Sequence, residues 1–94
     1  MIKWIYPPCG NCPVQAEGYF MGQYFYFRSR GTVARIDFSK TETYWDKDLI
    51  DTRYELWHTR VEGAAGWLPR WFCRVLIWWG CLRYLFKKDK NKTI

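Results

Sequence analysis

Two glycine-containing turns divide residues 14–38 into three short runs, and this pattern constrains the fold more than any other feature of the chain. Met21-Gly22 and Arg30-Gly31 separate the runs within the sequence VQAEGYFMGQYFYFRSRGTVARIDF. Glycine readily adopts the positive φ that two-residue hairpin turns require, so both turns indicate tight connections between antiparallel strands. We therefore expect a three-stranded meander.

Pairing the strands outward from these turns places large and small apolar side chains together on one face. In this register Phe25 lies opposite Gly18 on one neighbouring strand and opposite Ile36 on the other. Large residues facing small ones are typical of a well-packed sheet face, which we predict to be the core side. Its predicted members are Val14, Ala16, Gly18, Phe25, Phe27, Ala34, Ile36 and Phe38.

The opposite face is predicted to be polar and aromatic, with Glu17, Tyr26 and Arg35 in one cross-strand row. Tyrosines beside arginines could stack unpaired bases while the cations bind phosphates, as single-strand binders do. Glu17 and Asp37 share this face, however, and would repel phosphate. We therefore expect a solvated face with cross-strand ion pairs, whose aromatic side chains are available to a protein partner. Its predicted members are Gln15, Glu17, Tyr19, Tyr24, Tyr26, Arg28, Val33, Arg35 and Asp37.

Residues 68–88 form a tryptophan-rich segment whose apolar side chains recur at helical spacing. Arg74 and Arg83 flank the uncharged run 75–82, which is therefore much shorter than the roughly 20 apolar residues that span a membrane. Pro69 suits a first helical turn. We predict an amphipathic helix that covers the sheet, and attachment to a membrane interface is the weaker alternative. The predicted sheet-facing stripe is Trp71, Val75, Trp78, Trp79, Leu82, Leu85 and Phe86, with Phe72 and Leu76 at its border and Arg70, Arg74, Lys87 and Lys88 opposite.

The remaining segments complete a single domain, because two cores in a chain of 94 residues would each be too small to fold. Residues 1–13 are expected to be an irregular arm, and residues 89–94 a frayed basic tail. Residues 39–66 are expected to hold a loop and a fourth strand near 53–61, although 48–61 also fits a helical pattern. The predicted class is α+β: a three- to four-stranded antiparallel meander packed by one C-terminal amphipathic helix.

The chemistry-bearing residues do not form a recognisable reactive site. Cys9 and Cys12 have C-x-x-C spacing, which provides half a zinc site or a redox pair. Cys73 and Cys81 are eight residues apart on the predicted helix, about 12 Å, too far to bind one zinc ion together. His58 has no nucleophile motif around it. We therefore expect no catalytic residues, no metal, no cofactor and no enzymatic activity.

The charge of the chain indicates the kind of partner it favours. A net charge of +6 favours nucleic acid, an anionic membrane or an acidic protein surface, and also fits an ordinary basic surface. The N-terminal sequence MIKWIYPPCGNCP lacks the apolar run of a signal peptide, so we expect a cytoplasmic protein with reduced thiols.

Three short motifs resemble those of small proteins encoded by bacteriophages and prophages: CPVQAEG, then G-x-x-FYFRSR, then AGWLP before a terminal helix. The resemblance covers about residues 12–86. Compact phage proteins of this size, anti-CRISPR proteins among them, often bind a host defence component and block one of its surfaces. The resemblance implies a non-enzymatic inhibitor or accessory protein in the bacterial cytoplasm, and it assigns no functional residues.

The expected function is therefore protein binding, with a host defence complex such as a CRISPR effector subunit as partner and no membrane partner. Tyrosine, tryptophan and arginine dominate interface hot spots, and this chain is rich in all three. The alternative is a nucleic-acid-binding accessory protein that uses the same basic and aromatic surfaces. The predicted contact residues are Tyr24, Tyr26, Arg28, Arg35, Arg70 and Arg74.

Overall fold

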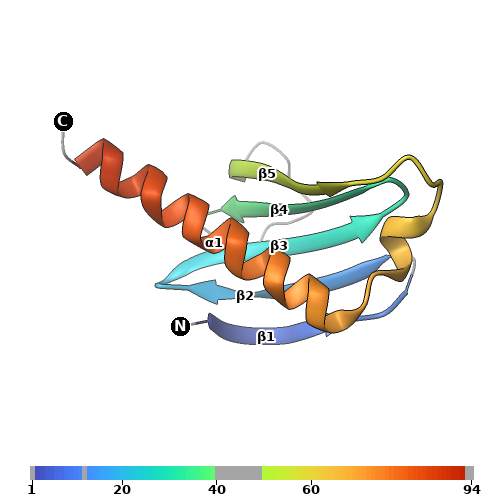
Figure 1. The fold of residues 1–94 in the computed structure, drawn as a ribbon. Helices are drawn as coiled ribbons and strands as arrows, with labels where there is room; N and C mark the ends of the chain where they lie inside the picture. Colours follow the sequence, from blue (N-terminus) through green and yellow to red (C-terminus); the bar gives the residue numbers. More distant parts are fainter. Residues whose placement is uncertain (1, 12, 40–49, 93–94) are drawn as a thin grey trace.

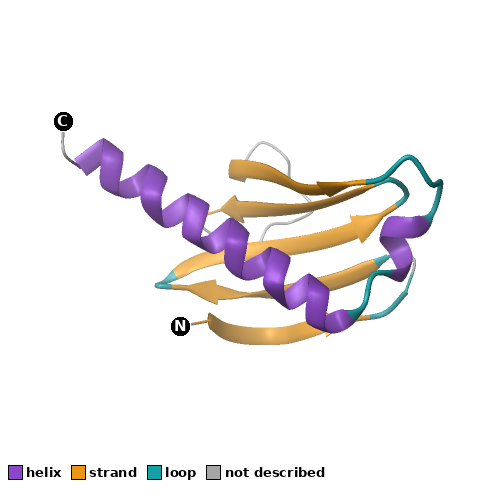
Figure 2. Cartoon of the chain, viewed as in Figure 1, coloured by secondary structure: helices purple, strands orange, loops and turns teal. Residues whose placement is uncertain are grey.

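A computed structural model describes residues 2–11, 13–39 and 50–92, which form a five-stranded antiparallel sheet with one long helix across one face (Figures 1 and 2). The strands lie side by side in chain order. The α+β class is confirmed, with five strands in place of the expected three to four. The elements are β1 (Ile2–Cys9), β2 (Val14–Phe20), β3 (Gln23–Arg30), β4 (Val33–Ser39), β5 (Ile50–His58), the 3₁₀ helix η2 (Ala64–Trp67) and α1 (Arg70–Lys92).

Strand β1 is the additional strand, and it corrects the expectation that residues 1–13 form an irregular arm. It pairs antiparallel with β2, with register shifts on both sides of Tyr6. Pro7 and Pro8 concealed it, because proline cannot donate to a strand ladder. Proline is nevertheless accommodated on edge strands and at bulges. Strand β1 lies at the edge of the sheet, and its pairing with β2 contains register shifts of the bulge type.

The predicted meander is present, but its second turn lies one residue later than expected. Arg30 pairs with Val33, so the turn residues are Gly31 and Thr32. Every partner between β3 and β4 therefore moves by two residues, and Phe25 faces Phe38 instead of Ile36. A two-residue shift preserves the alternation of side chains, so the faces of the strands are unchanged. The predicted core face is confirmed, and its buried members are Val14, Ala16, Gly18, Phe25, Phe27, Ala34, Ile36 and Phe38.

The boundaries of the last strand and of the helix differ from the predictions. The ambiguous segment is a strand, β5, which begins three residues before the expected 53–61 and ends at His58. Helix α1 begins at Arg70 and runs through Lys92, so residues 89–92 continue the helix and are not the expected frayed tail. Figure 1 shows α1 crossing the sheet diagonally, with its C-terminal turns projecting past the strands.

Helix α1 packs on the sheet through the face opposite to the predicted one. The predicted sheet-facing stripe is largely exposed, which makes that prediction wrong, apart from Leu76 and the half-buried Phe72 and Leu85. The packing face instead carries small and medium side chains. Its buried members are Cys73, Leu76, Ile77, Gly80, Cys81 and Tyr84.

Close approach of helix and sheet explains this choice of face. A Cβ atom on Gly80 would lie 2.7 Å from Cγ2 of Ile36 and 3.3 Å from Cδ2 of Leu56, so only glycine fits there without a shift. The sheet supplies large phenylalanine rings, and Tyr84 stacks on Phe38 with centroids 4.2 Å apart. Because the strands already fill the core with rings, the helix face that fits is the one with small residues.

Contacts at both margins of the sheet hold α1 in this orientation. On the β1 side, the Arg74 guanidinium lies 5.4 Å from the centroid of the Trp4 ring. On the β5 side, the Arg83 guanidinium lies 4.4 Å from the Tyr54 centroid. Cation–π contacts of this kind contribute roughly 0.5–1 kcal/mol each at exposed positions. The cations beside the apolar stripe therefore contact the sheet margins and stabilise the outward orientation of the tryptophans.

Helix η2 fixes the point where the chain enters α1. The Ala65 amide donates to the Gly31 carbonyl oxygen at 3.0 Å, and the Ser29 hydroxyl donates to the Ala65 carbonyl oxygen. Both groups of Ala65 are thereby bonded to the β3–β4 hairpin, where Ala65 is fully buried. The start of α1 is anchored to the same end of the sheet as the β3–β4 turn, as Figure 1 shows.

Candidate partner-binding surfaces

The outer side of α1 carries a continuous apolar stripe, which we call the tryptophan face. Its members recur every three or four residues on the outer side of the helix, with exposed fractions between 39% and 68%. The Trp78 ring also contacts the sheet, since it packs edge-on against Phe20 of β2 with centroids 6.0 Å apart. Trp67, at the end of η2 and one turn before the stripe, is exposed as well. The tryptophan face consists of Trp71, Val75, Trp78, Trp79, Leu82 and Phe86.

The tryptophan face is large enough to be a functional apolar patch. Aromatic side chains carry about 150–250 Å² each, so half-exposed rings and two aliphatic side chains leave about 500 Å² of apolar surface accessible. The largest apolar patch on a typical monomer is about 300–600 Å² and is often functional. The tryptophan face is therefore the strongest candidate for a binding surface among the described residues.

Cations border the tryptophan face on both sides. Arg70 and Arg74 lie along one flank, and Arg83 and Lys87 lie along the other, all four exposed. Residues 70–87 contain no aspartate or glutamate. Arg74, Arg83 and Lys87 contact Trp4, Tyr54 and Thr52 of the sheet, yet their charges remain at the rim. An apolar stripe with a cationic rim fits a surface with an apolar centre and an acidic surround.

The predicted contact tyrosines lie on the other face of the sheet, and they are buried. Tyr24 is 1% exposed and Tyr26 is 8% exposed, so the expectation of a solvated aromatic face is wrong at these positions. The Tyr24 hydroxyl donates to the Glu17 carboxylate, and Tyr6 of β1 also hydrogen-bonds to Glu17. Burial and this hydrogen bond raise the pKa of Tyr6 well above its ordinary value of 10.0.

An ion pair between Asp37 on β4 and Arg53 on β5 extends this polar network to the edge of the sheet formed by β5. Arg53 on β5 donates from Nε to Oδ1 of Asp37 at 2.7 Å and from a terminal nitrogen to Oδ2 at 3.2 Å. This bidentate pair raises the pKa of Arg53 still further. Together with Glu17, it forms a polar layer that crosses the whole sheet. Its cross-strand row is Tyr6, Glu17, Tyr26, Asp37 and Arg53.

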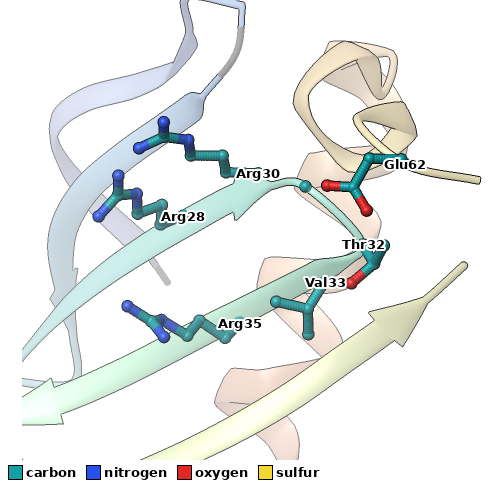
Figure 3. A pocket seen from close by; sticks show the side chains of 7 residues that line it. Arg28, Arg30, Thr32, Val33, Arg35 and Glu62 are labelled. Atoms are coloured by element: carbon teal, nitrogen blue, oxygen red, sulfur yellow. The ribbon is translucent and has the colours of Figure 1, made fainter.

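Two of the predicted arginines are brought together by the corrected register. Arg28 on β3 lies directly opposite Arg35 on β4, where Tyr26 had been the expected neighbour of Arg35. With Arg30 they line a cavity of about 330 Å³ beside the β3–β4 turn, which Glu62 also lines (Figure 3). Figure 3 shows the three arginine side chains extending in the same direction.

The six predicted contact residues therefore occupy three separate places. Tyr24 and Tyr26 belong to the buried polar layer. Arg28 and Arg35 belong to the cavity on the face of the sheet opposite α1, and Arg70 and Arg74 form one flank of the tryptophan face. The tryptophan face itself was missed as a contact surface. The signal for it was the small residues on the other side of the helix, because Cys73, Gly80 and Cys81 mark a face suited to close packing.

The thiols show no arrangement that points to chemistry within the described ranges. Cys73 and Cys81 are fully buried, and burial raises the pKa of Cys73 to about 11 and that of Cys81 to about 12. Cys9 is exposed at the end of β1, and its predicted partner Cys12 lies outside the described residues. No group of three histidine, cysteine or acidic side chains close enough to hold a metal occurs in the described part of the chain.

Comparisons with known proteins add no family to this description. No protein-family model matches the chain, and neither curated proteins nor solved structures give a match. In the described part of the chain, no helix has the length and apolar character needed to cross a membrane.

Proposed function

We propose that this protein is a non-enzymatic binding protein that docks its tryptophan face into an apolar groove on an acidic partner protein. The observation that carries this proposal is the outward orientation of the stripe. Four exposed large side chains, Trp71, Trp78, Trp79 and Phe86, are aromatic, and aromatic residues with arginine dominate interface hot spots. Helix-in-groove recognition uses anchors at this spacing.

The area of the tryptophan face sets a requirement on the partner. About 500 Å² of apolar surface is less than the roughly 800 Å² per partner of a standard protein interface. A stable complex must therefore also bury part of the rim, which is cationic on both flanks. The matching surface needs carboxylates around an apolar centre. A second copy of this chain fits poorly as the partner. Docking two such helices would bring the cationic flanks with Arg74 and Arg83 close to each other, and residues 70–87 hold no acidic side chain to pair with them.

From the sequence resemblance we also propose the biological setting: a bacteriophage-encoded inhibitor of a bacterial defence complex, acting in the host cytoplasm. The alternative of nucleic-acid binding relied on tyrosine rings as a stacking platform. Since Tyr24 and Tyr26 are buried, the accessible geometry favours the helix as the contact surface.

The test compares two exposed apolar positions with the same accessibility. Trp71 and Met21 are each 68% exposed, Trp71 on the tryptophan face and Met21 on the β2–β3 turn. We expect Trp71→Glu to weaken binding to a purified CRISPR effector complex at least tenfold by biolayer interferometry, while Met21→Glu leaves it unchanged. Equal loss in both variants, or no loss in either, would contradict the proposed surface.

A vesicle control separates a protein partner from a lipid one. Membrane binding would not require α1 to leave the sheet, because the tryptophan face is already exposed. Sedimentation with vesicles of 70% phosphatidylcholine and 30% phosphatidylglycerol should leave the protein in the supernatant. Pelleting that Trp71→Glu abolishes would overturn the protein-partner proposal in favour of a membrane surface.

A further inference from the structure

We propose that the cavity lined by Arg28, Arg30 and Arg35 binds a small phosphate ester, at a site separate from the tryptophan face. The three arginines lie on strands β3 and β4, on the sheet face opposite α1. A ligand bound there would leave the helix surface accessible. The proposal does not depend on which partner the tryptophan face binds.

The pairing of the strands creates an unfavourable concentration of positive charge. Arg28 and Arg35 are direct cross-strand partners, and like charges placed opposite each other destabilise a sheet. Arg30 follows Arg28 by two residues and therefore lies on the same face of β3. Figure 3 shows all three guanidinium groups on one side of the cavity. An anion bound between the guanidinium groups would relieve this repulsion, and arginine is well suited to bind phosphate.

No carboxylate among the described residues forms an ion pair with this cluster, although Glu62 also lines the cavity. No ion pair joins Arg28, Arg30 or Arg35 to an acid in the described ranges. The acids nearest in register are engaged elsewhere. Glu55, the cross-strand partner of Arg35, bonds to His58 at 2.7 Å, and Asp37 is held by Arg53. Among the described residues, the three guanidinium groups therefore have no ion-pair partner, and an anionic ligand can supply one.

The cavity has the size of a small-molecule site, and its lining is mainly cationic. About 330 Å³ lies within the roughly 300–1,000 Å³ range of ligand pockets. Arginine forks match phosphate oxygens in bidentate geometry, which points to a phosphoryl group at that side. Val33 and the Gly31-Thr32 turn provide a less polar wall between the arginines and Glu62.

Glu62 narrows the ligand class. Its carboxylate lies on the side of the β3–β4 turn away from the guanidinium groups (Figure 3). A carboxylate there repels a second anionic group and accepts hydrogen bonds from hydroxyl or amine groups. The matching ligand has one phosphate and a hydroxyl-bearing body, as in a sugar phosphate or nucleoside monophosphate. A nucleic-acid strand fits less well, because the neighbouring Tyr24 and Tyr26 rings are buried and cannot stack successive bases.

The test measures binding of ribose 5-phosphate and adenosine 5′-monophosphate by isothermal titration calorimetry at constant ionic strength. We expect millimolar or tighter binding, weakened at least tenfold by Arg28→Gln and by Arg35→Gln. Arg70→Gln is the matched control, since it removes one positive charge on the helix and should leave affinity within twofold. Glu62→Gln should weaken ribose 5-phosphate while leaving inorganic phosphate unchanged or tighter.

Thermal unfolding adds a readout with a characteristic sign. Without ligand, Arg35→Gln should keep or raise the Tm because it relieves repulsion, whereas ribose 5-phosphate should raise the Tm of the wild type alone. The proposal is overturned if neither phosphate ester binds at 10 mM, or if the arginine variants bind as well as the wild type. It is also overturned if affinity grows steadily with the length of an oligothymidylate, because that result would assign the arginines to a nucleic-acid surface.

Discussion

The inverted packing of α1 makes a quantitative prediction about two side chains on opposite sides of the helix. Ile77 is fully buried against the sheet, whereas Trp71 is 68% exposed. Ile77→Ala removes three carbon atoms, worth about 2.4 kcal/mol at about 0.8 kcal/mol each, and the cavity left behind brings the loss to about 3–4 kcal/mol. For a domain of this size, that loss lowers the Tm by about 12–32 °C.

Trp71→Ala should cost much less, although the side chain removed is larger. About a third of the ring is covered, roughly 60 Å², which is worth about 1.5 kcal/mol at 25 cal/mol per Å². Alanine returns about 0.5 kcal/mol through its higher helix propensity, so the net loss is about 1 kcal/mol.

Urea unfolding followed by circular dichroism measures both free energies without relying on tryptophan fluorescence. Repeating it at two protein concentrations tenfold apart removes any contribution from self-association, because the midpoint of a monomer does not depend on concentration. If Trp71→Ala destabilises the protein as much as Ile77→Ala, or more, the tryptophans face the sheet and the proposed binding surface fails.

Two further predictions test the interior of the fold. Burial raises the pKa of Cys73 to about 11 and that of Cys81 to about 12, so both thiols should resist alkylation by iodoacetamide at pH 8 while the exposed Cys9 reacts. Peptide mass spectrometry measures the extent of modification at each cysteine. Modification of Cys73 at the rate of Cys9 would contradict its burial. The raised pKa of Tyr6 contributes stability that is present below pH 10 and lost at higher pH, where the unfolded chain ionises first. Tyr6→Phe should therefore lower the free energy of unfolding at pH 7 by about 1–2 kcal/mol, because Glu17 loses a hydrogen-bond donor. The same variant should lose less stability than the wild type as the pH rises above 10, as urea titrations at several pH values would measure. If both proteins lose stability equally above pH 10, the raised pKa of Tyr6 is contradicted.

Local patterns carried much of the architecture. Gly22 and Gly31 marked both tight turns, and the alternation of side chains outward from those turns assigned the core face of three strands. The second turn was misplaced by one residue, but the two-residue shift that follows left the faces intact. Strand β1 was missed because Pro7 and Pro8 are unfavourable in a central strand, and only the tertiary structure places them at an edge.

The candidate sites were less accessible to sequence reasoning. Arg28 and Arg35 were named as contact residues, yet their direct pairing depends on a turn position that composition does not specify. Tyr24 and Tyr26 were expected at the surface, because alternation identifies which face a residue occupies and not what covers that face. Their burial involves the Glu17 network, which joins side chains from β1, β2 and β3.

By itself, the sequence determined the strands of the meander, their core face and the existence of an amphipathic C-terminal helix, because these follow from turn chemistry and from spacings of two and 3.6 residues. The tertiary structure alone decided which side of that helix meets the sheet. Hydrophobicity favoured the tryptophan side, but a sheet already filled with phenylalanine rings leaves room only for the side with Cys73, Gly80 and Cys81. Packing volume outweighed hydrophobicity, and the tryptophans were left facing outward, available to a partner.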